Sequence, residues 1–357
     1  MSLLFSPITI KNITLKNRIA VSPMCEYSSI DGFANNWHLV HLGSRAVGGA
    51  ALIITEAAAV SPEGRISIAD MGIWKDEHIE KLKEITNFIH ENGAIAGIQL
   101  AHAGRKASFD IPWKTPQQLE EENGGWETVS ASAERFNATD KTPIALEISG
   151  IERVKADFKS ATLRALKAGF KVVEIHAAHG YLLHQFLSPI SNRRTDAYGG
   201  SFENRIKLLI ETVKEVQEVW PKENPLFVRI SATDWAEGGW TVAESVQLSA
   251  LLKTMGVDLI DTSSGGLTLS QEIPLSAGYQ VQFASAIKEE SKILTGAVGL
   301  ITNAQQAEAI LQSGEADLIF IAREFLRDPY FPLHAAFELD DDVKWPSQYE
   351  RAKPRKK

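Results

Sequence analysis

The fold class is decided by the stretch Val172-Val173-Glu174-Ile175-His176-Ala177-Ala178-His179-Gly180-Tyr181, because it joins a buried strand to a polar loop. Glu174 and His176 stand at alternate positions of the strand and therefore point to the same face. His176 ends the strand, and His179 and Tyr181 follow in the loop. We expect the two imidazoles and the phenol to lie together where this strand ends.

Similar strands recur along the chain, separated by helical segments. The predicted strands are residues 18–21, 51–55, 95–99, 172–176, 226–230, 259–262, 293–295 and 318–321. Helical periodicity covers residues 77–92, 151–168, 202–220, 242–255, 279–291 and 303–313. This alternation predicts one α/β domain over residues 1–357, a closed (β/α)8 TIM barrel. An open doubly wound sheet is the alternative, but no Gly-x-Gly-x-x-Gly follows the first strand.

One segment interrupts this alternation. Residues 103–147 follow the third predicted strand, contain Trp113, Trp126 and the acidic run 120–122, and show little periodicity. Long loops that leave a barrel strand lie on the face that holds the active site, so we predict a lid-like insertion. A disordered surface insertion is the alternative, because the segment is polar.

Composition limits the classes of function. With 357 residues, 44% of them hydrophobic, the chain can bury a large core. The net charge of -8 argues against nucleic acid and anionic membranes as partners, because only residues 351–357 form a basic cluster. No apolar run reaches the roughly 20 residues of a membrane span, and residues 1–17 lack a secretory pattern, so we expect a cytoplasmic protein. The single cysteine, Cys25, excludes internal disulfides and fits a reducing compartment.

Small residues and an arginine follow the last two predicted strands. Gly299 comes after the seventh strand, and Ala322 and Arg323 come after the eighth. Barrels often bind phosphate at this place through backbone N–H groups and a helix N-terminus, and arginine offers a planar fork of donors. The alternatives are a plain turn at Gly299 and an ion pair between Arg323 and Glu324 or Asp328.

Polar residues also lie in or after other strands. Gln99 ends the third predicted strand, Arg229 lies in the fifth, and residues 262–266 leave the sixth. A charge inside a barrel is costly unless it is paired, so Arg229 is expected to face an anionic or electron-rich group. A structural ion pair with Glu174 is the alternative for Arg229, and a core amide satisfied by backbone is the alternative for Gln99.

In combination, these motifs resemble those of the old yellow enzyme family of FMN-dependent ene-reductases, and within it the thermophilic-like branch. The resemblance spans nearly the whole chain, and its most specific part is the block of residues 176–201. The other motifs are residues 22–27 (SPMCEY), 56–58 (EAA), 99–105 (QLAHAGR), 228–231 (VRIS) and 320–329 (FIAREFLRDP). The resemblance implies a barrel that binds FMN and takes hydride from NADPH or NADH.

The resemblance also implies roles for individual residues. His176 and His179 resemble the pair that hydrogen-bonds the substrate's carbonyl oxygen, Tyr181 resembles the proton donor, and Tyr27 resembles a wall of the substrate pocket. The thiol of Cys25 would lie beside the flavin and tune its potential, with an inert buried cysteine as the alternative. The implied FMN contacts are Ser22, Pro23, Met24, Cys25, Ala58, Gln99, Arg229, Gly299, Ala322 and Arg323.

The C-terminal tail, residues 338–357, carries a further motif of this branch. Tyr349-Glu350-Arg351 matches a segment whose arginine reaches a neighbouring subunit's pocket, which implies a homodimer or homotetramer with Arg351 at the substrate. The Gly-Trp that follows in some relatives is replaced by Ala352-Lys353, so an aromatic wall from the partner is not expected.

The implied activity is reduction of the activated C=C bond of α,β-unsaturated carbonyl compounds, and of nitro compounds or quinones, with protonation by Tyr181. Three alternatives remain: another FMN barrel such as a dihydrouridine synthase, a metal-dependent barrel lyase or aldolase, and a flavin-binding protein without turnover. The acidic charge opposes a synthase that acts on tRNA. His176 and His179 alone make an incomplete metal site, so no metal is expected.

Overall fold

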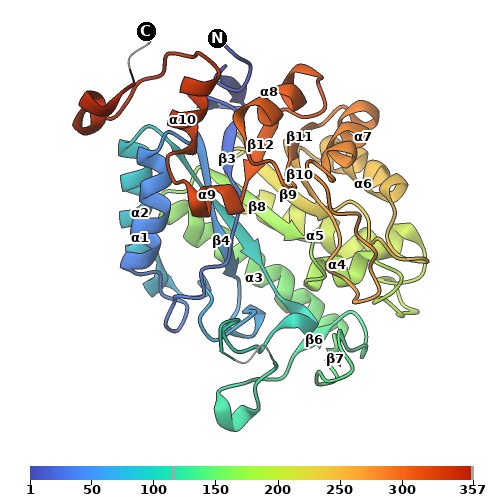
Figure 1. The fold of residues 1–357 in the computed structure, drawn as a ribbon. Coiled ribbons are helices and arrows are strands. Elements are labelled where there is room, and N and C mark those ends of the chain that lie inside the picture. The colour runs from blue at the N-terminus through green and yellow to red at the C-terminus, as the bar shows by residue number, and fades with distance from the viewer. Residues whose placement is uncertain (115–116, 355–357) are drawn as a thin grey trace.

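The computed structural model describes residues 1–114 and 117–354. Residues 115–116 of the predicted insertion and residues 355–357 of the predicted tail lie outside the described residues. The described chain contains a closed barrel of parallel strands in the order β10-β11-β12-β3-β4-β5-β8-β9, surrounded by helices (Figure 1). The predicted TIM barrel is therefore confirmed, and the open sheet is wrong.

The barrel strands begin and end within a few residues of the predicted ones. They are β3 (Ile19–Val21), β4 (Leu52–Ala59), β5 (Ile95–Ala101), β8 (Val172–Ala177), β9 (Leu226–Ser231), β10 (Leu259–Ser263), β11 (Leu294–Ala297) and β12 (Leu318–Ile321). Every neighbouring pair is parallel, so the carboxyl ends of all these strands meet at one mouth.

The six predicted helices are confirmed, and further helices that the sequence analysis did not predict join them. The helices are α1 (Asn36–Val47), α2 (Ile79–Glu91), α3 (Ile148–Lys167), α4 (Leu182–Leu187), α5 (Phe202–Val219), α6 (Val242–Thr254), α7 (Val281–Ser291), α8 (Ala304–Gln312), α9 (Arg323–Arg327) and α10 (Phe331–Glu338). Side-chain caps fix several helix starts. Ser201 caps α5, and Thr241 forms a reciprocal capping box with Glu244 at the start of α6.

Two apolar clusters divide the interior. The larger one lies between the strands and the surrounding helices. The smaller one fills the barrel and includes Ile10 and Leu15 from the antiparallel hairpin of β1 (Ile8–Ile10) and β2 (Ile13–Leu15). Because this hairpin packs against the first residues of several strands, it closes the end of the barrel opposite the mouth. The apolar filling includes Leu52, Val172, Phe227, Leu259 and Leu318.

The segment after β5 contains short elements and extends away from the barrel (Figure 1). They are η3 (Gly104–Lys106), η4 (Glu121–Asn123), β6 (Val129–Ser130) and β7 (Ile144–Ala145). Trp126 fastens the described part of this segment, because its indole donates to Glu63 O at 2.9 Å and its ring lies under the Arg65 guanidinium at 4.7 Å. The lid role of residues 103–147 stays a prediction.

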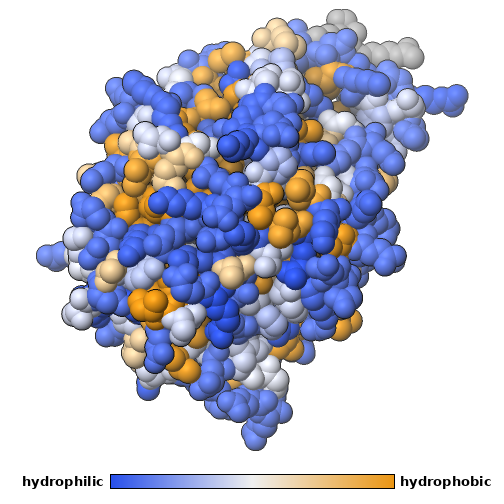
Figure 2. All heavy atoms as spheres, turned by 180° about the vertical axis from the view of Figure 1, so that it is seen from behind, coloured by the Kyte–Doolittle hydropathy of each residue, from blue (hydrophilic) through white to orange (hydrophobic). Residues whose placement is uncertain are grey.

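The outer surface mixes polar and apolar side chains. Figure 2 shows apolar residues in small groups among polar ones on the face opposite to that of Figure 1. Among the described residues, no helix combines the length and the apolar character that crossing a membrane requires.

Candidate active site

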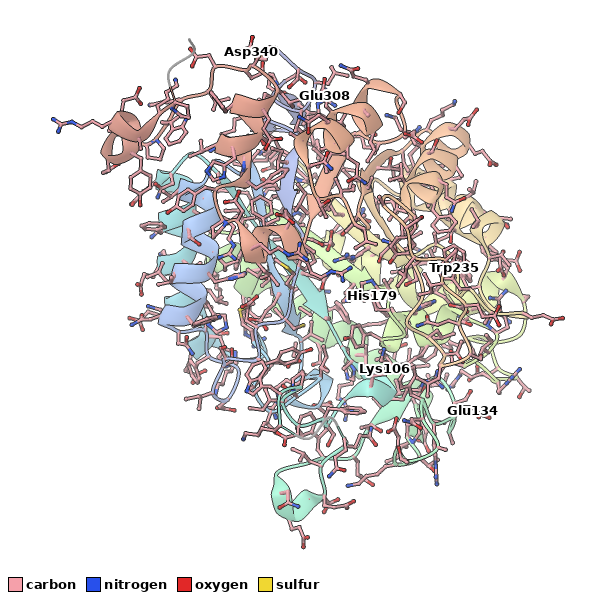
Figure 3. All side chains as sticks on the ribbon, viewed as in Figure 1. Lys106, Glu134, His179, Trp235, Glu308 and Asp340 are labelled. Carbon is pink, nitrogen blue, oxygen red and sulfur yellow. The ribbon has the colours of Figure 1, made fainter. Side chains whose placement is uncertain are left out.

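Three aromatic side chains, from the end of β8 and from the loop that follows it, meet at the barrel mouth. The ring centroids of His176 and His179 are 5.1 Å apart, those of His176 and Tyr181 are 5.1 Å apart, and those of His179 and Tyr181 are 6.5 Å apart. All three pairs meet edge to face. The structure therefore brings together the three residues that the sequence proposed as catalytic. Figure 3 shows His179 near the centre of the molecule, with Lys106 close by.

A tight backbone turn holds these rings in place. His179 and Gly180 both have left-handed φ angles, of 58° and 73°. A methyl group on Gly180 would lie 2.2 Å from Gly266 O in the loop after β10, so only glycine fits. The Gly180 N–H donates to Nδ1 of His184 at 2.9 Å, and His184 in turn lies 2.9 Å from Asp234 in a fully buried pair. This anchor on α4 fixes the loop between the strand and the helix.

Both imidazoles are neutral at physiological pH. Desolvation, and next the charge of Arg229, hold the pKa of His176 and of His179 well below the usual value. Nδ1 of His176 accepts the Ala178 N–H at 3.3 Å, so the neutral ring carries its proton on Nε2. Nε2 of His179 lies 2.7 Å from Ser263 Oγ, which orients the ring.

Tyr181 retains its proton and lies beside a buried ammonium group. Burial raises the pKa of the Tyr181 phenol well above its usual value. Nζ of Lys106 lies 5.1 Å from the centroid of the Tyr181 ring and donates to His179 O and Gly266 O, each at 2.9 Å. Burial, and next the charge of Arg105, lower the pKa of Lys106 to about 8. Lys106 thus contacts the loop after β8, the loop after β10 and the ring of Tyr181.

Lys106 is not among the site residues predicted from the sequence. Its only signal there is its place directly after the quoted motif that ends in Arg105. Arg105 fixes the insertion itself, because its guanidinium donates to Glu134 O, Arg135 O and Leu267 O. The two neighbouring cations therefore join the insertion to the mouth of the barrel.

The loop after β3 lies against the same site. Cys25 and Tyr27 lie near each other in this loop, and both groups contribute to raising the pKa of Tyr181. Burial, and next the carboxylates of Asp70 and Glu56, raise the pKa of the Cys25 thiol well above its usual value. The raised pKa keeps the Cys25 thiol neutral. Cys25 is partly exposed, so it lies at the surface of the site and is not a buried core residue.

Tyr27 and its neighbours frame one side of the mouth. Tyr27 has a left-handed φ of 47°, and its ring meets the exposed Trp113 edge to face with a centroid distance of 6.0 Å. Pro23 and Met24 are partly buried in the same loop. Ala58 is fully buried in β4.

Paired polar side chains line the inside of the barrel below the rings. Nε2 of Gln99 donates to Glu174 Oε1 at 2.8 Å, so Gln99 is satisfied by a side chain and not by backbone. Nε of Arg229 lies 3.1 Å from Asp261 Oδ2. The ion-pair partner of Arg229 is therefore Asp261, and the predicted alternative of Glu174 is corrected.

A hollow of about 180 Å³ follows the last two barrel strands. Gly299, Ala322 and Arg323 lie on its wall, together with Ser263 and Gln280. Gly299 has φ 125°, and a methyl group there would approach the Gln280 side chain to 2.9 Å, so a glycine keeps the backbone accessible.

The cation of Arg323 is available at this hollow. Arg323 is exposed at the start of α9. Glu324 pairs with Arg327 at 2.7 Å and Asp328 with His334 at 2.6 Å, so each carboxylate that the sequence proposed as a partner of Arg323 pairs with another residue.

These features fit a bound FMN. The hollow beside Gly299 and Arg323 suits a phosphate, because it combines accessible backbone with an exposed cation. Ser22 has a buried hydroxyl without a hydrogen-bond partner among residues 1–114 and 117–354, and such a group fits a ligand contact. Gln99 on β5 and Arg229 on β9 are buried on other strands of the same barrel.

Arg351 lies apart from the three rings. It is exposed on η5 (Ser347–Ala352), where Tyr349 contacts Tyr330 with a centroid distance of 5.9 Å. Figure 1 shows this segment beside α10 at the edge of the molecule. A role for Arg351 at the substrate therefore needs a second subunit, and it stays a prediction.

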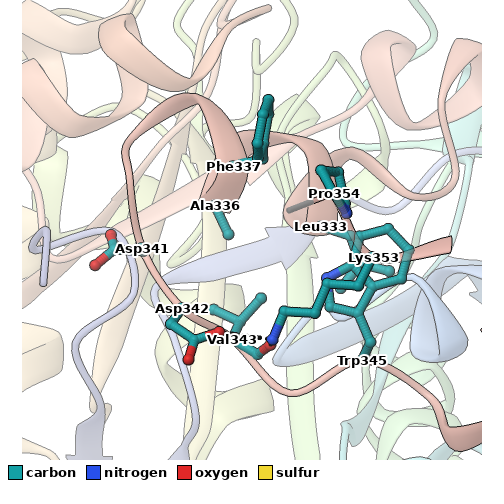
Figure 4. Close-up of a pocket in the computed structure, with 9 residues that line it drawn as sticks. All are labelled: Leu333, Ala336, Phe337, Asp341, Asp342, Val343, Trp345, Lys353 and Pro354. Atoms are coloured by element: carbon teal, nitrogen blue, oxygen red, sulfur yellow. Dashed lines mark hydrogen bonds and ion pairs between the residues drawn. The ribbon is translucent and has the colours of Figure 1, made fainter. Parts of the chain in front are cut away.

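Two further features lie outside the mouth. A hollow of about 280 Å³ lies between α10 and the tail and is lined by Leu333, Ala336, Phe337, Asp341, Asp342, Val343, Trp345, Lys353 and Pro354 (Figure 4). It contains none of the predicted site residues. Within the part of the chain that the structure describes, no three His, Cys, Asp or Glu side chains are grouped so that they could hold a metal ion.

Comparison with known proteins gives concordant results. A protein-family model described as the NADH:flavin oxidoreductase / NADH oxidase family matches residues 3–342. A morphinone reductase structure is 28% identical with a TM-score of 0.80, and the match covers 97% of this chain and 92% of that one. The old yellow enzyme homologue from Zymomonas mobilis is 26% identical with a TM-score of 0.79, and the match covers 98% of each chain.

A larger protein shares the fold. A complex of 2-naphthoyl-CoA reductase is 24% identical with a TM-score of 0.86, and the match covers 95% of this chain but only 52% of that chain. This chain thus corresponds to about half of that reductase. One of the morphinone reductase structures contains tetrahydroNAD.

Proposed function

Because this chain belongs to the NADH:flavin oxidoreductase / NADH oxidase family of FMN-binding proteins, which includes the old yellow enzymes, we propose that it is an NAD(P)H-dependent ene-reductase. Its substrates would be α,β-unsaturated carbonyl compounds, and also nitro compounds or quinones. The product would be the compound with the activated C=C bond reduced.

The observation that carries this proposal is the convergence of His176, His179 and Tyr181 in defined protonation states. Two neutral imidazoles are hydrogen-bond donors that do not transfer their own proton readily, and a phenol with a raised pKa retains the proton that it must deliver. Such a set suits a substrate whose oxygen becomes negative during the reaction.

Each residue has a role in this chemistry. When bound, FMN would supply the hydride chemistry between the nicotinamide and the alkene. His176 and His179 donate to the carbonyl oxygen, where each well-placed donor stabilises the developing negative charge by roughly 3 to 4 kcal/mol. Tyr181 then donates its proton to the α-carbon, and Lys106 holds the Tyr181 ring and both loops in place.

The cofactor site would use residues from several strand ends. Ser22, Pro23, Met24, Cys25 and Ala58 would border the ring system. Gln99 and Arg229 would contact its polar edge from the barrel interior, and Tyr27 would border the substrate. Gly299, Ala322 and Arg323 would hold the phosphate.

The cellular setting belongs to the same proposal. We place the enzyme in the cytoplasm, as the single cysteine suggests. It would act as a homodimer or homotetramer in which Arg351 reaches the substrate of a neighbouring subunit. The tetrahydroNAD complex of a related morphinone reductase supports a nicotinamide donor, and the donor that we propose here is NADPH or NADH.

The proposal is tested with purified protein and 2-cyclohexenone. We expect a yellow protein that NADPH bleaches without oxygen, that cyclohexenone reoxidises, and that accumulates cyclohexanone in proportion to the NADPH consumed. A flavoprotein that NADPH bleaches but that neither cyclohexenone nor a nitroalkene reoxidises would refute the ene-reductase assignment. A colourless protein without FMN would refute the proposed cofactor as well.

A further inference from the structure

The barrel interior below the three rings contains two buried carboxyl groups and one buried cation. Glu174 on β8 stands opposite Gln99 on β5, and Asp261 on β10 stands opposite Arg229 on β9, in the register of neighbouring strands. His176 is the register partner of Arg229 on the other side. Arg229 thus stands between Asp261 and His176, the ring that the substrate oxygen would contact.

Hydrogen bonds leave both carboxyl groups incompletely satisfied. The Gln99 amide donates to only one oxygen of Glu174, and Oε2 of Glu174 has no partner among the described residues. The same holds for Oδ1 of Asp261. The contact of Asp261 with Arg229, at 3.1 Å, is an ion pair rather than an aligned hydrogen bond.

Charge balance in this cluster follows from burial. Glu174 and Asp261 are fully buried, and Arg229 is 5% exposed. Burial, and next the charge of Asp261, raise the pKa of Glu174 to about 8, while burial raises that of Asp261 to about 6 against the opposing effect of Arg229. Glu174 is therefore the acid that burial and Asp261 favour in its neutral form, and the charges of Asp261 and Arg229 oppose each other.

The positive charge of Arg229 acts on the two imidazoles at the barrel mouth. Its charge is the main electrostatic cause that lowers the pKa of both His176 and His179. The negative charge of Asp261, on the neighbouring strand β10, opposes the electrostatic effect of Arg229 on these imidazoles. Removing Asp261 takes away the nearest counter-charge of this cation, and Glu174, whose pKa Asp261 raises and Arg229 lowers, is then the carboxyl group that can take its place.

We propose that Asp261 is a positioning residue that limits the positive field of Arg229, and that this ion pair keeps the reduction potential of bound FMN low while Glu174 remains its neutral neighbour. This inference rests on the proposed binding of FMN. It assigns a function to two barrel residues that touch neither the substrate nor the reacting atoms.

The test compares two isosteric variants of the FMN-loaded protein by anaerobic redox titration at pH 7. In Asp261→Asn combined with Glu174→Gln, where Glu174 cannot take up the lost charge, the affinity for reduced FMN relative to oxidised FMN is expected to rise about tenfold, which corresponds to a shift of about 30 mV to more positive potential. Glu174→Gln, the matched control, replaces a neutral acid by a neutral amide and leaves the potential at the wild-type value. The inference is overturned if the double variant has the same potential as Glu174→Gln or a more negative one.

A second comparison does not depend on the folding of Asp261→Asn. The groups that face Glu174 are Gln99 from β5, Arg229 from β9, Asp261 from β10 and His176 from its own strand. As pH rises through about 8, Glu174 becomes negative and disfavours electron uptake, so between pH 7 and pH 9 the wild-type potential falls further than that of Glu174→Gln. Equal falls in the two proteins contradict the charge assignment.

The apoprotein provides a readout that is independent of FMN. The infrared C=O band of protonated carboxylic acids, to which Asp70 also contributes, is expected to lose intensity at pH 7 in Glu174→Gln, and equal intensity in the two proteins contradicts the neutral state of Glu174. The potentials also separate the two proposals. If the protein is yellow and reduces enones but its variants have unaltered potentials, only this inference is refuted. A protein that cannot bind FMN refutes both.

Discussion

The ammonium group of Lys106 lies over the ring of Tyr181, 5.1 Å from its centroid, while the same group hydrogen-bonds the backbone of both loops at the mouth. A single buried cation therefore connects the geometry of the loops with the position of the proton donor. Its second aromatic neighbour is Phe136 of the insertion, at 4.5 Å.

Lys106→Met is expected to reduce enone turnover about tenfold, because it removes two charge-assisted hydrogen bonds and the contact with the Tyr181 ring. The loss is expected in the reoxidation of the flavin by enone and not in its reduction by NADPH. The matched control is Lys171→Met on the exposed surface, for which we expect wild-type kinetics. Equal turnover in the two variants would show that Lys106 has no role in the reaction.

Gly180→Ala is expected to lower the free energy of unfolding by about 2 to 4 kcal/mol, because the residue has φ 73° and its new methyl would meet Gly266 O. Gly200→Ala is the control, because Gly200 also has a left-handed φ, of 81°, but nothing lies within 4 Å of its added methyl. Here we expect a loss of only about 1 kcal/mol. Chemical denaturation measures both values, and similar losses would show that the contact between the two loops is not tight.

Much of the fold was predictable because apolar strands carry a local signal. The strand of residues 318–321 was predicted with its observed ends. β4 extends beyond its predicted end to Ala59, because Glu56 and three alanines lack the β-branched pattern and a bulge lies between Ile54 and Ala57. The helix α1 was missed, because its buried face carries His38, His41 and Arg45, which hide the amphipathic pattern.

The site was predictable where neighbouring residues in sequence are also neighbours in space. His176, His179 and Tyr181 lie within residues 176–181, at the end of β8 and in the loop after it, so the motif alone indicated their proximity. The pairing of Arg229 with Asp261 and the contact of Lys106 with the loop after β10 depend on barrel register and on long-range packing. No local pattern encodes those contacts.

The thiol of Cys25 is expected to react slowly with iodoacetamide at pH 8, at least about tenfold more slowly than in the unfolded chain, because only the thiolate is nucleophilic. The chain has one cysteine, so mass spectrometry follows this reaction without interference. Asp70→Asn removes the largest nearby charge that raises the pKa of Cys25, and it is expected to accelerate the reaction. Rapid alkylation of the native wild type would contradict a neutral thiol.

His176→Ala is expected to slow reoxidation of the reduced protein by cyclohexenone about 100-fold, because it removes one donor to the developing oxyanion. Bound FMN and its reduction by NADPH are expected to be retained. His334→Ala on the exposed face of α10 is the control and should behave as wild type. Unaltered reoxidation in His176→Ala would exclude this imidazole from the substrate site.

The central claim is that Tyr181 delivers the proton to a substrate held by the two imidazoles, and anaerobic stopped-flow measurement of Tyr181→Phe tests it most directly. The account predicts that reduction by NADPH keeps the wild-type rate while reoxidation by cyclohexenone becomes at least about 100-fold slower. Equal losses in the two half-reactions, or reoxidation at the wild-type rate, would contradict it.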